Sequence, residues 1–234
     1  MAGEDRFRTG YVCFDLEGNK RWSAETEITR SGGDRQDVYT LTEKGKGYYS
    51  GFKGKVSWVA ALEFESNENA VKPLRMERRT ISEEGEPIAL EVQEFDFVNK
   101  KVTCIYEDLV KGSKRKKIFK IKGDIANRLI LGLYVQKFLE NGKKKQTVYM
   151  LSGEPSLYKI NIKVLDKEKI NINGREKPAY RLCLDPDLGL FNVLKVILPK
   201  AYVWHSAAPK FEWLKYVGLE GSVSSPKVEI RTLD

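Results

Sequence analysis

The stretch "VSWVAALEF", residues 56–64, shows which kind of fold this chain adopts. Side chains on an extended strand point alternately to opposite faces of a sheet. One face of this stretch therefore carries only apolar side chains, namely Val56, Trp58, Ala60, Leu62 and Phe64. A continuous apolar face of this kind predicts a β-strand with one side buried in a core.

The same alternation recurs along the chain. In "YKINIKVL", residues 158–165, the apolar side chains take one face, and lysine and asparagine take the other. "KVTCIYED" (101–108) and "PKVEIRTL" (226–233) alternate in the same way, and glycine-containing turn signals separate such segments. We expect ten or more strands in a mainly β (β-dominated α+β) fold, with a strongly curved antiparallel sheet forming a barrel or half-barrel.

One segment has a helical pattern instead. Apolar residues repeat at helical spacing from Ile125 onward, with Asp124 as the expected N-cap and Gly142 as the expected stop. The pattern predicts one helix near 125–140 packed on the sheet or plugging it, and a shorter helical piece over 187–197. Within "IALEVQEFDF" the apolar parity changes, which predicts a β-bulge near Gln93–Glu94.

Composition limits the remaining choices. The 234 residues are 41% hydrophobic and 32% charged, and no linker or repeat is visible, so we predict a single β-rich domain over 1–234. No apolar run approaches the roughly 20 residues of a transmembrane helix. Three cysteines, Cys13, Cys104 and Cys183, form no C-x-x-C pair; at most one disulfide can form, and three partly buried thiols are the simpler expectation.

The glycine-rich stretch "EKGKGYYSGFKGKV", residues 43–56, resembles a phosphate-binding loop in composition only. A Walker loop needs Gly-Lys followed by Ser or Thr, which no Gly-Lys pair here has. We interpret Gly45, Gly47, Gly51 and Gly54 as positions where a strand of a curved sheet bends or bulges.

No residue pattern points to catalysis, a metal or a cofactor. The single histidine, His205, precedes Ser206 without a G-x-S-x-G motif and is expected to be structural. The carboxylates Glu63, Glu65 and Glu91 are expected on solvated strand faces rather than as a glycosidase pair. The basic run at 111–123 fits a charged hairpin that protects an edge strand, so nucleic acid is not the expected partner despite a net charge of +8.

Aromatic residues make up 11% of the chain and concentrate in strand-like segments. Most should lie in the core, but a wide barrel leaves interior space for a ligand. If the interior is hollow, the residues expected to line the ligand-binding cavity are Trp58, Leu62, Phe64, Trp204 and Trp213.

Four segments taken in order carry a family resemblance: "KPLRMERRTIS…EFDFVNKKVTCIYED", "GDIANRLILGLYVQKFL", "YKINIKVLDKEKININGREKPAYRLCL" and "AYVWHSAAPKFEWLKYVGLEGSVSSPKVEI". Over roughly residues 35–232 the chain resembles bacterial envelope β-proteins grouped as domain of unknown function family 3108. The resemblance implies an antiparallel β-fold and export, and it implies no site residues. The polar start "MAGEDRFRTG" departs from an export signal; it fits either a cytoplasmic start or a start that replaces a removed signal.

Three hypotheses about function follow. The first is a non-enzymatic periplasmic or envelope protein that binds a lipid or another amphipathic envelope molecule in the cavity. The second is an envelope scaffold or assembly factor that binds protein or polysaccharide through its outer surface. A glycan-active enzyme is the third, and a cytoplasmic location is the alternative to the periplasm.

Overall fold

The computed structural model describes residues 6–30, 37–187, 200–208, 210–221 and 225–233. These residues form fifteen strands and one helix. In chain order the elements are β1 (Arg6–Asp15), β2 (Lys20–Arg30), β3 (Val38–Gly47), β4 (Val56–Ser66), β5 (Val71–Ser82), β6 (Pro87–Asp96), β7 (Lys101–Asp108), β8 (Ser113–Lys120), β9 (Ile125–Asn127), α1 (Leu131–Glu140), β10 (Lys145–Leu151), β11 (Leu157–Ile172), β12 (Arg175–Asp187), β13 (Ala201–Ser206), β14 (Trp213–Leu219) and β15 (Lys227–Thr232).

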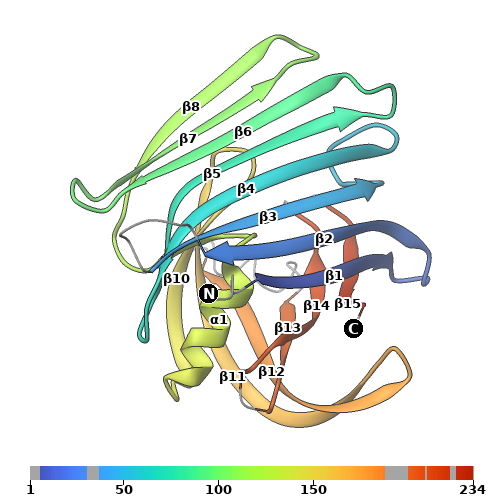
Figure 1. Cartoon of the computed structure of the whole chain (residues 1–234), viewed down its shortest axis with the longest axis vertical. Coiled ribbons are helices and arrows are strands. Elements are labelled where there is room, and N and C mark those ends of the chain that lie inside the picture. Colours follow the sequence, from blue (N-terminus) through green and yellow to red (C-terminus); the bar gives the residue numbers. More distant parts are fainter. Residues whose placement is uncertain (1–5, 31–36, 188–199, 209, 222–224, 234) are drawn as a thin grey trace, which may run out of the picture.

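All strands belong to one sheet in the order β8-β7-β6-β5-β4-β3-β2-β1-β15-β14-β13-β12-β11-β10-β9. Neighbours are antiparallel except for β9 and β10, and the first and last described strands, β1 and β15, pair with each other. Figure 1 shows this sheet curving so that α1 lies between its two halves. The prediction of a mainly β fold with a strongly curved antiparallel sheet is confirmed; the sheet is barrel-like but not closed, because β8 and β9 end it without pairing.

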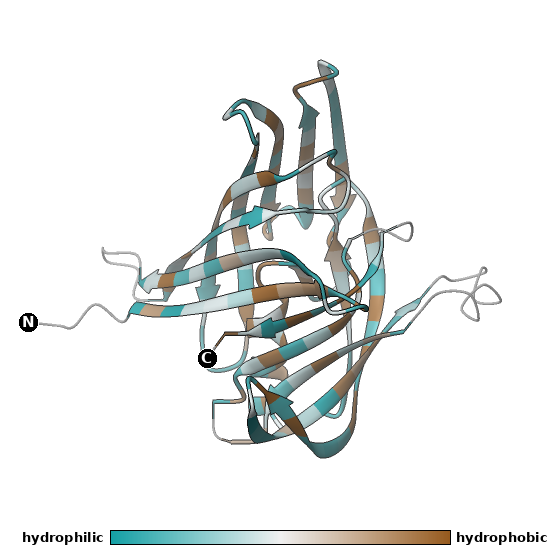
Figure 2. Ribbon diagram, turned by 90° about the vertical axis from the view of Figure 1, so that its right-hand side faces the viewer, coloured by the Kyte–Doolittle hydropathy of each residue, from teal (hydrophilic) through white to brown (hydrophobic). Residues whose placement is uncertain are grey.

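Alternation explains why the inner face of the sheet is buried. The five apolar residues of β4 that share one face are at most 3% exposed, as the sequence predicts. Brown and teal residues accordingly alternate along many strands in Figure 2. Leu62 and Phe64 pack with the buried side of α1, which includes Val135 and Phe138.

The helix begins later than expected, at Leu131, because residues 125–127 form the short strand β9 beside β10. Asp124 is therefore not the N-cap. Instead the Asn127 side-chain oxygen accepts hydrogen bonds from the backbone N–H groups of Leu129 and Ile130 and turns the chain into α1. At the other end Gly142 ends the helix as predicted, with a positive φ of 65° and its N–H donated to the carbonyl of Leu139.

Strand β6 differs most from its predicted form. Its pairing with β7 is regular through Gln93 and Glu94, so the predicted bulge is absent there, and the register shift between β5 and β6 lies at Thr80/Ile81 instead. The inward face carries Ala89, Glu91, Gln93 and Phe95. Glu91 therefore points into the molecule, and the expectation that it is solvated is wrong. The helical piece predicted over 187–197 lies outside the described residues, apart from Asp187 at the end of β12.

Apolar side chains fill the seam where the sheet is not paired. One buried cluster joins residues of β6 and β7 to residues from the β8–β9 connection, β9 and β10; its members are Phe95, Val102, Cys104, Ile121, Ile125 and Leu151. The three cysteines of the chain are all free and buried. Among the described elements, α1 is the single helix, and it is too short to cross a membrane.

Candidate functional site

A row of polar residues crosses the inner face of four strands. Glu43 on β3 is the cross-strand partner of Ala60 on β4, Ala60 is the partner of Arg78 on β5, and Arg78 is the partner of Glu91 on β6. Glu43, Arg78 and Glu91 are only 7–8% exposed. Ala60 contributes a single methyl group between the first two, which leaves room for their long side chains. Buried charges are costly unless they are paired, so this row needs an explanation.

Glu43 is held as a carboxylate by two donors. Its Oε1 accepts a hydrogen bond of 2.7 Å from Trp58 Nε1 and one of 2.8 Å from Nη2 of Arg128, which reaches the row from the β9–α1 corner. Burial alone would raise the pKa of Glu43, but the positive charges of Arg128 and Arg78 outweigh it and lower that pKa. About a third of the Arg128 side chain remains exposed, at 35%, so solvent reaches this part of the interior.

Glu91 has the opposite character. Its Oε1 accepts a hydrogen bond of 2.8 Å from Gln93, whose own side-chain oxygen accepts one of 3.1 Å from Asn127. Burial raises the pKa of Glu91, and the charges of Arg78 and Arg128 only partly offset it. Two carboxyl groups in one row thus have pKa values shifted in opposite directions.

Arg78 lies between these two acids but forms a salt bridge with neither among the described residues. Its guanidinium carbon is 4.4 Å from the ring centre of Tyr49 and 5.2 Å from that of Trp58. The Nε and Nη2 atoms are buried and have no hydrogen-bond partner. Burial and the nearby Arg128 lower the pKa of this guanidinium.

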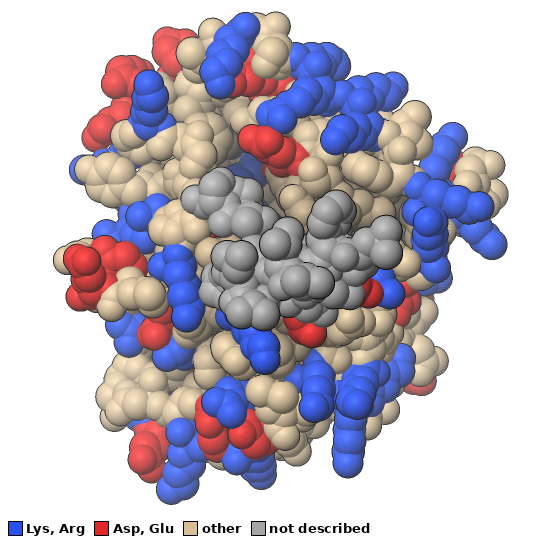
Figure 3. All heavy atoms as spheres, turned by 180° about the vertical axis from the view of Figure 1, so that it is seen from behind, with Lys and Arg blue, Asp and Glu red and all other residues tan. Residues whose placement is uncertain are grey.

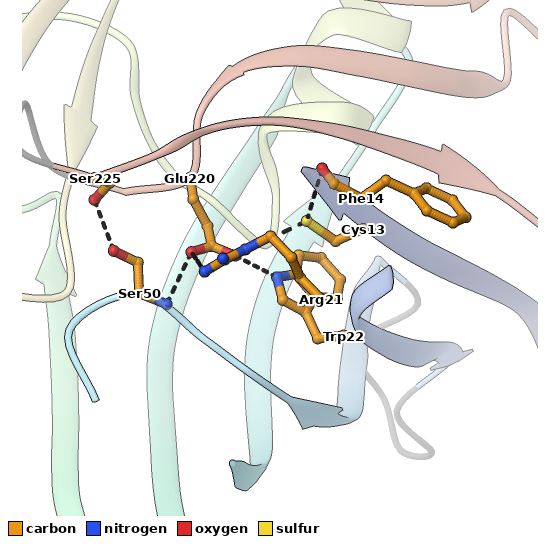
Figure 4. Close-up of polar contacts among 7 residues, drawn as sticks. All are labelled: Cys13, Phe14, Arg21, Trp22, Ser50, Glu220 and Ser225. Carbon is orange, nitrogen blue, oxygen red and sulfur yellow. Dashed lines mark hydrogen bonds and ion pairs between the residues drawn. The ribbon is translucent and has the colours of Figure 1, made fainter. Parts of the chain in front are cut away.

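Another buried glutamate, Glu220, fixes the glycine-rich stretch in place. Figure 4 shows Glu220, which follows β14, between residues of β1, β2 and the β3–β4 loop. Its oxygens accept hydrogen bonds from Arg21, from Trp22 Nε1 at 2.6 Å and from the backbone N–H of Ser50 at 2.8 Å. The stretch at 43–56 is therefore the end of β3 and the β3–β4 loop, which Ser50 ties to Glu220 after β14. This agrees with the interpretation of its glycines as structural.

Gly45 and Gly47 confirm why this stretch needs glycine. A side chain on Gly45 would overlap the indole ring of Trp58, its cross-strand partner, and Gly47 has a φ of 136°. The missing side chain of Gly45 allows Trp58 to lie against the backbone of β3 and reach Glu43.

The structure separates the five residues predicted to line a ligand cavity. Trp58 lies beside the polar row, whereas Leu62 and Phe64 pack with α1. Trp213 packs against the same α1-containing cluster and has its ring 5.0 Å from that of Tyr11. Trp204 lies on the opposite side of the sheet, because its neighbour Val203 faces α1, and its Nε1 donates to Glu168. Their contact with a ligand stays a prediction.

The other candidates have structural surroundings. His205 is fully buried, with Nδ1 2.7 Å from the carbonyl oxygen of Phe211, and burial lowers its pKa to about 4.

The basic run forms β8 at the edge of the sheet, as predicted, with Lys114 paired to Glu107 and Arg115 to Glu154. Figure 3 shows lysine and arginine spread over one face with acidic residues between them. A cavity of about 230 Å³ lies beside α1, lined partly by Lys72, Lys137 and Lys143.

Sequence reasoning missed Glu43 and Arg78 of the polar row, Arg128, which pairs with Glu43, and the ring of Tyr49 beside them. A signal was present in β5, where Met76, Arg78 and Thr80 share a face. That alternation places Arg78 on the inward face with Met76. Because an arginine is normally expected to face solvent, Arg78 was not identified as buried. Arg128 carried no such signal, because it precedes α1 in a turn.

Comparison with solved structures supports the fold. A crystal structure described as a beta-barrel-like protein of domain of unknown function DUF1849 from Brucella abortus matches with a TM-score of 0.55 and 8% identity, over 99% of this chain and 96% of that one. The hypothetical lipoprotein YmcC from Escherichia coli (K12) matches with a TM-score of 0.34 and 9% identity, over 97% of this chain and 87% of that one. At these identities the first likeness concerns the fold alone.

Comparison by sequence identifies the family. No curated protein matches the chain. A family model described as "Protein of unknown function (DUF3108)" matches residues 7–197, most of the chain, in agreement with the resemblance seen in the sequence. The chain therefore belongs to this family of proteins of unknown function, DUF3108.

Proposed function

We propose that the protein is a non-enzymatic binding protein of the bacterial cell envelope, which holds a lipid or another amphipathic molecule against the inner face of its curved sheet. One observation carries this proposal. At the end of the inner face that α1 does not cover, Tyr49, Phe52 and Ile88 pack on the buried residues Trp22 and Trp58 yet remain partly exposed. Partly exposed apolar and aromatic side chains next to a few polar groups are typical of the lining of small-molecule sites.

The location of the site agrees with this role. Trp58 joins these side chains to the four-strand polar row: its ring packs with Tyr49 at 5.2 Å, and its Nε1 donates to Glu43. An amphipathic molecule needs an apolar surface and a polar surface in contact. At this end of the sheet, Tyr49 and Trp58 supply the apolar surface, and Glu43 beside them supplies the polar one. The periplasmic location is part of the proposal and rests on the resemblance to envelope proteins.

Native mass spectrometry of the purified protein tests the proposal. We expect an adduct near one molecule per chain, which organic solvent releases and which a bacterial envelope lipid extract restores. Phe52→Ser should lower its occupancy, because Phe52 is partly exposed at the site. Ile118→Ser is the control, since Ile118 is 62% exposed on β8 and points away from the inner face on which its neighbour Phe119 packs.

A clean apo mass together with no uptake from the lipid extract would overturn the proposal. The outer-surface alternative, a scaffold for protein or polysaccharide, would then be the hypothesis to test by affinity capture. Equal occupancy in Phe52→Ser and the wild type would place the ligand elsewhere on the protein.

A further inference from the structure

The guanidinium group of Arg78 has one edge with two unused donors. Nε and Nη2 lie on the same edge of an arginine side chain, where their N–H bonds point in parallel, and in Arg78 these are the two buried atoms without a partner. Leaving such donors unpaired inside a protein is costly. Nε of Arg231 is also buried without a hydrogen-bond partner, but that side chain forms an ion pair with Glu229, whereas Arg78 forms none among the described residues. The unpaired edge of Arg78 therefore indicates a binding role.

Two other arginines of this protein show what that edge binds. Nε and Nη2 of Arg21 donate to the two carboxylate oxygens of Glu220, at 3.3 and 3.0 Å. The same atoms of Arg181 donate to the two oxygens of Asp166, at 3.1 and 2.9 Å. In both cases a planar oxyanion matches the two parallel N–H bonds.

The acids near Arg78 do not serve this edge. Glu43 uses Oε1 for Trp58 and Arg128, and Glu91 accepts from Gln93 through its Oε1. Neither forms an ion pair with Arg78 within salt-bridge distance among the described residues. A second positive charge is close, because the guanidinium carbons of Arg78 and Arg128 lie 4.4 and 5.6 Å from the centre of the same Tyr49 ring.

We propose that Arg78, with Arg128 beside it, binds an oxyanion, and that the proposed amphipathic ligand therefore carries a phosphate or carboxylate group. This inference rests on the proposed function and specifies the ligand class. The anionic group takes the Nε–Nη2 edge of Arg78, and the apolar part lies on Tyr49, Phe52 and Ile88. Tyr49 contacts both arginines and the aromatic cluster, so one ring joins the polar and apolar halves of the site.

Three probes separate the contributions to binding: octyl phosphate, octanol and inorganic phosphate, each titrated calorimetrically into the delipidated protein. We expect octyl phosphate to bind at least about tenfold more tightly than octanol, since hydrogen bonds to a charged group contribute about 1.5–3 kcal/mol, which corresponds to about tenfold or more. We expect inorganic phosphate to bind more weakly than octyl phosphate, because it lacks the apolar chain.

Arg78→Leu is the decisive variant, and Arg79→Leu is its matched control. Arg79 is the next residue on β5, points to the opposite face and is paired with Glu77. Arg78→Leu should weaken octyl phosphate binding by about tenfold or more and leave octanol binding unchanged, whereas Arg79→Leu should change neither. Arg78→Lys keeps the charge without the two parallel donors and should lose most of the preference for octyl phosphate over octanol.

A stability measurement provides an independent readout. Octyl phosphate should raise the melting temperature of the wild type and of Arg79→Leu, and it should raise that of Arg78→Leu much less, because a ligand stabilises the folded state in proportion to its affinity. An equal rise in Arg78→Leu and in the wild type would overturn the inference, since the anionic group would then bind elsewhere.

The outcomes distinguish the two proposals. If the wild type binds neither octyl phosphate nor octanol, the proposed function fails. If it binds both equally, and Arg78→Leu does not discriminate between them, the oxyanion inference fails while the proposed function stands. If inorganic phosphate binds as tightly as octyl phosphate, the partner is a soluble anion, and the assignment of an amphipathic ligand is overturned.

Discussion

Gly45 shows how one missing side chain shapes the interior. It is the cross-strand partner of Trp58, whose indole occupies the space of the absent Cβ and donates to the buried Glu43. We predict that Gly45→Ala destabilises the protein by about 1–3 kcal/mol, because the added methyl group forces the ring away and breaks this hydrogen bond. Equilibrium unfolding in urea, followed by tryptophan fluorescence, measures the change.

Gly123→Ala is the control for this substitution. A Cβ at Gly123 would meet Tyr149 at 3.5 Å, an ordinary van der Waals contact. Its free energy of unfolding should stay within about 0.5 kcal/mol of the wild type. If Gly45→Ala also leaves the free energy of unfolding unchanged, Trp58 shifts at no cost and the prediction is contradicted.

His205 gives the protein a predictable response to acid. It is fully buried, and because the carbonyl of Phe211 can only accept, Nδ1 carries the proton and donates. Burial lowers its pKa in the folded state to about 4, below the value of about 6.5 expected in the unfolded chain. Between these values the unfolded state takes up a proton that the folded state does not, so acid favours unfolding.

We therefore predict that the free energy of unfolding falls as the pH falls from about 6.5 to about 4, by up to ~3 kcal/mol from this residue. Glu91 opposes this trend, because its raised pKa makes the folded state the better proton acceptor in part of the same range. His205→Gln isolates the histidine, since an amide can still donate to Phe211. The free energy of unfolding of the wild type minus that of His205→Gln should fall as the pH falls from about 6.5 to about 4. A difference that does not change with pH would contradict the prediction.

At the scale of elements, the sequence predicted those whose buried face is apolar. Strand β4 follows its alternation throughout, because every inward residue from Val56 to Phe64 gains by leaving water. Strand β6 does not, because its inward Glu91 and Gln93 are hydrogen-bonded to each other, and Gln93 accepts a further hydrogen bond from Asn127 at the end of β9. Asn127 is not visible from the strand itself, and the apolar residues Leu90 and Val92 on the opposite face of β6 suggested that Glu91 faces solvent.

The start of α1 was mispredicted for a related reason. Helical spacing from Ile125 is compatible with a helix, but residues 125–127 pair with β10 and are fully enclosed, so tertiary contacts override the local pattern. The end of the helix was predictable, because Gly142 acts through its own backbone conformation. The polar row could be predicted least, since it depends on the register of four strands and on Arg128 from a distant turn.

At the scale of the whole molecule, the sheet is hydrogen-bonded from β8 to β9 but not across the opening between them. The apolar cluster that includes Val102 and Leu151 holds this seam. Side-chain packing without a hydrogen-bond ladder predicts that the molecule opens first at the seam. Such an opening would widen access to the inner face, where we place the ligand.

Leu151→Ala tests this view of the molecule. Leu151 is 3% exposed, and its truncation should destabilise the protein by about 2–5 kcal/mol. We predict that hydrogen–deuterium exchange, read by mass spectrometry, then accelerates most in β6–β8 and in β9–β10, on both sides of the seam. Leu214→Ala is the matched control, because Leu214 is 2% exposed in a different cluster with Ile172 and Trp204. Its exchange should instead accelerate around β11–β14, and the same uniform increase in both variants would mean that the sheet opens only as a whole.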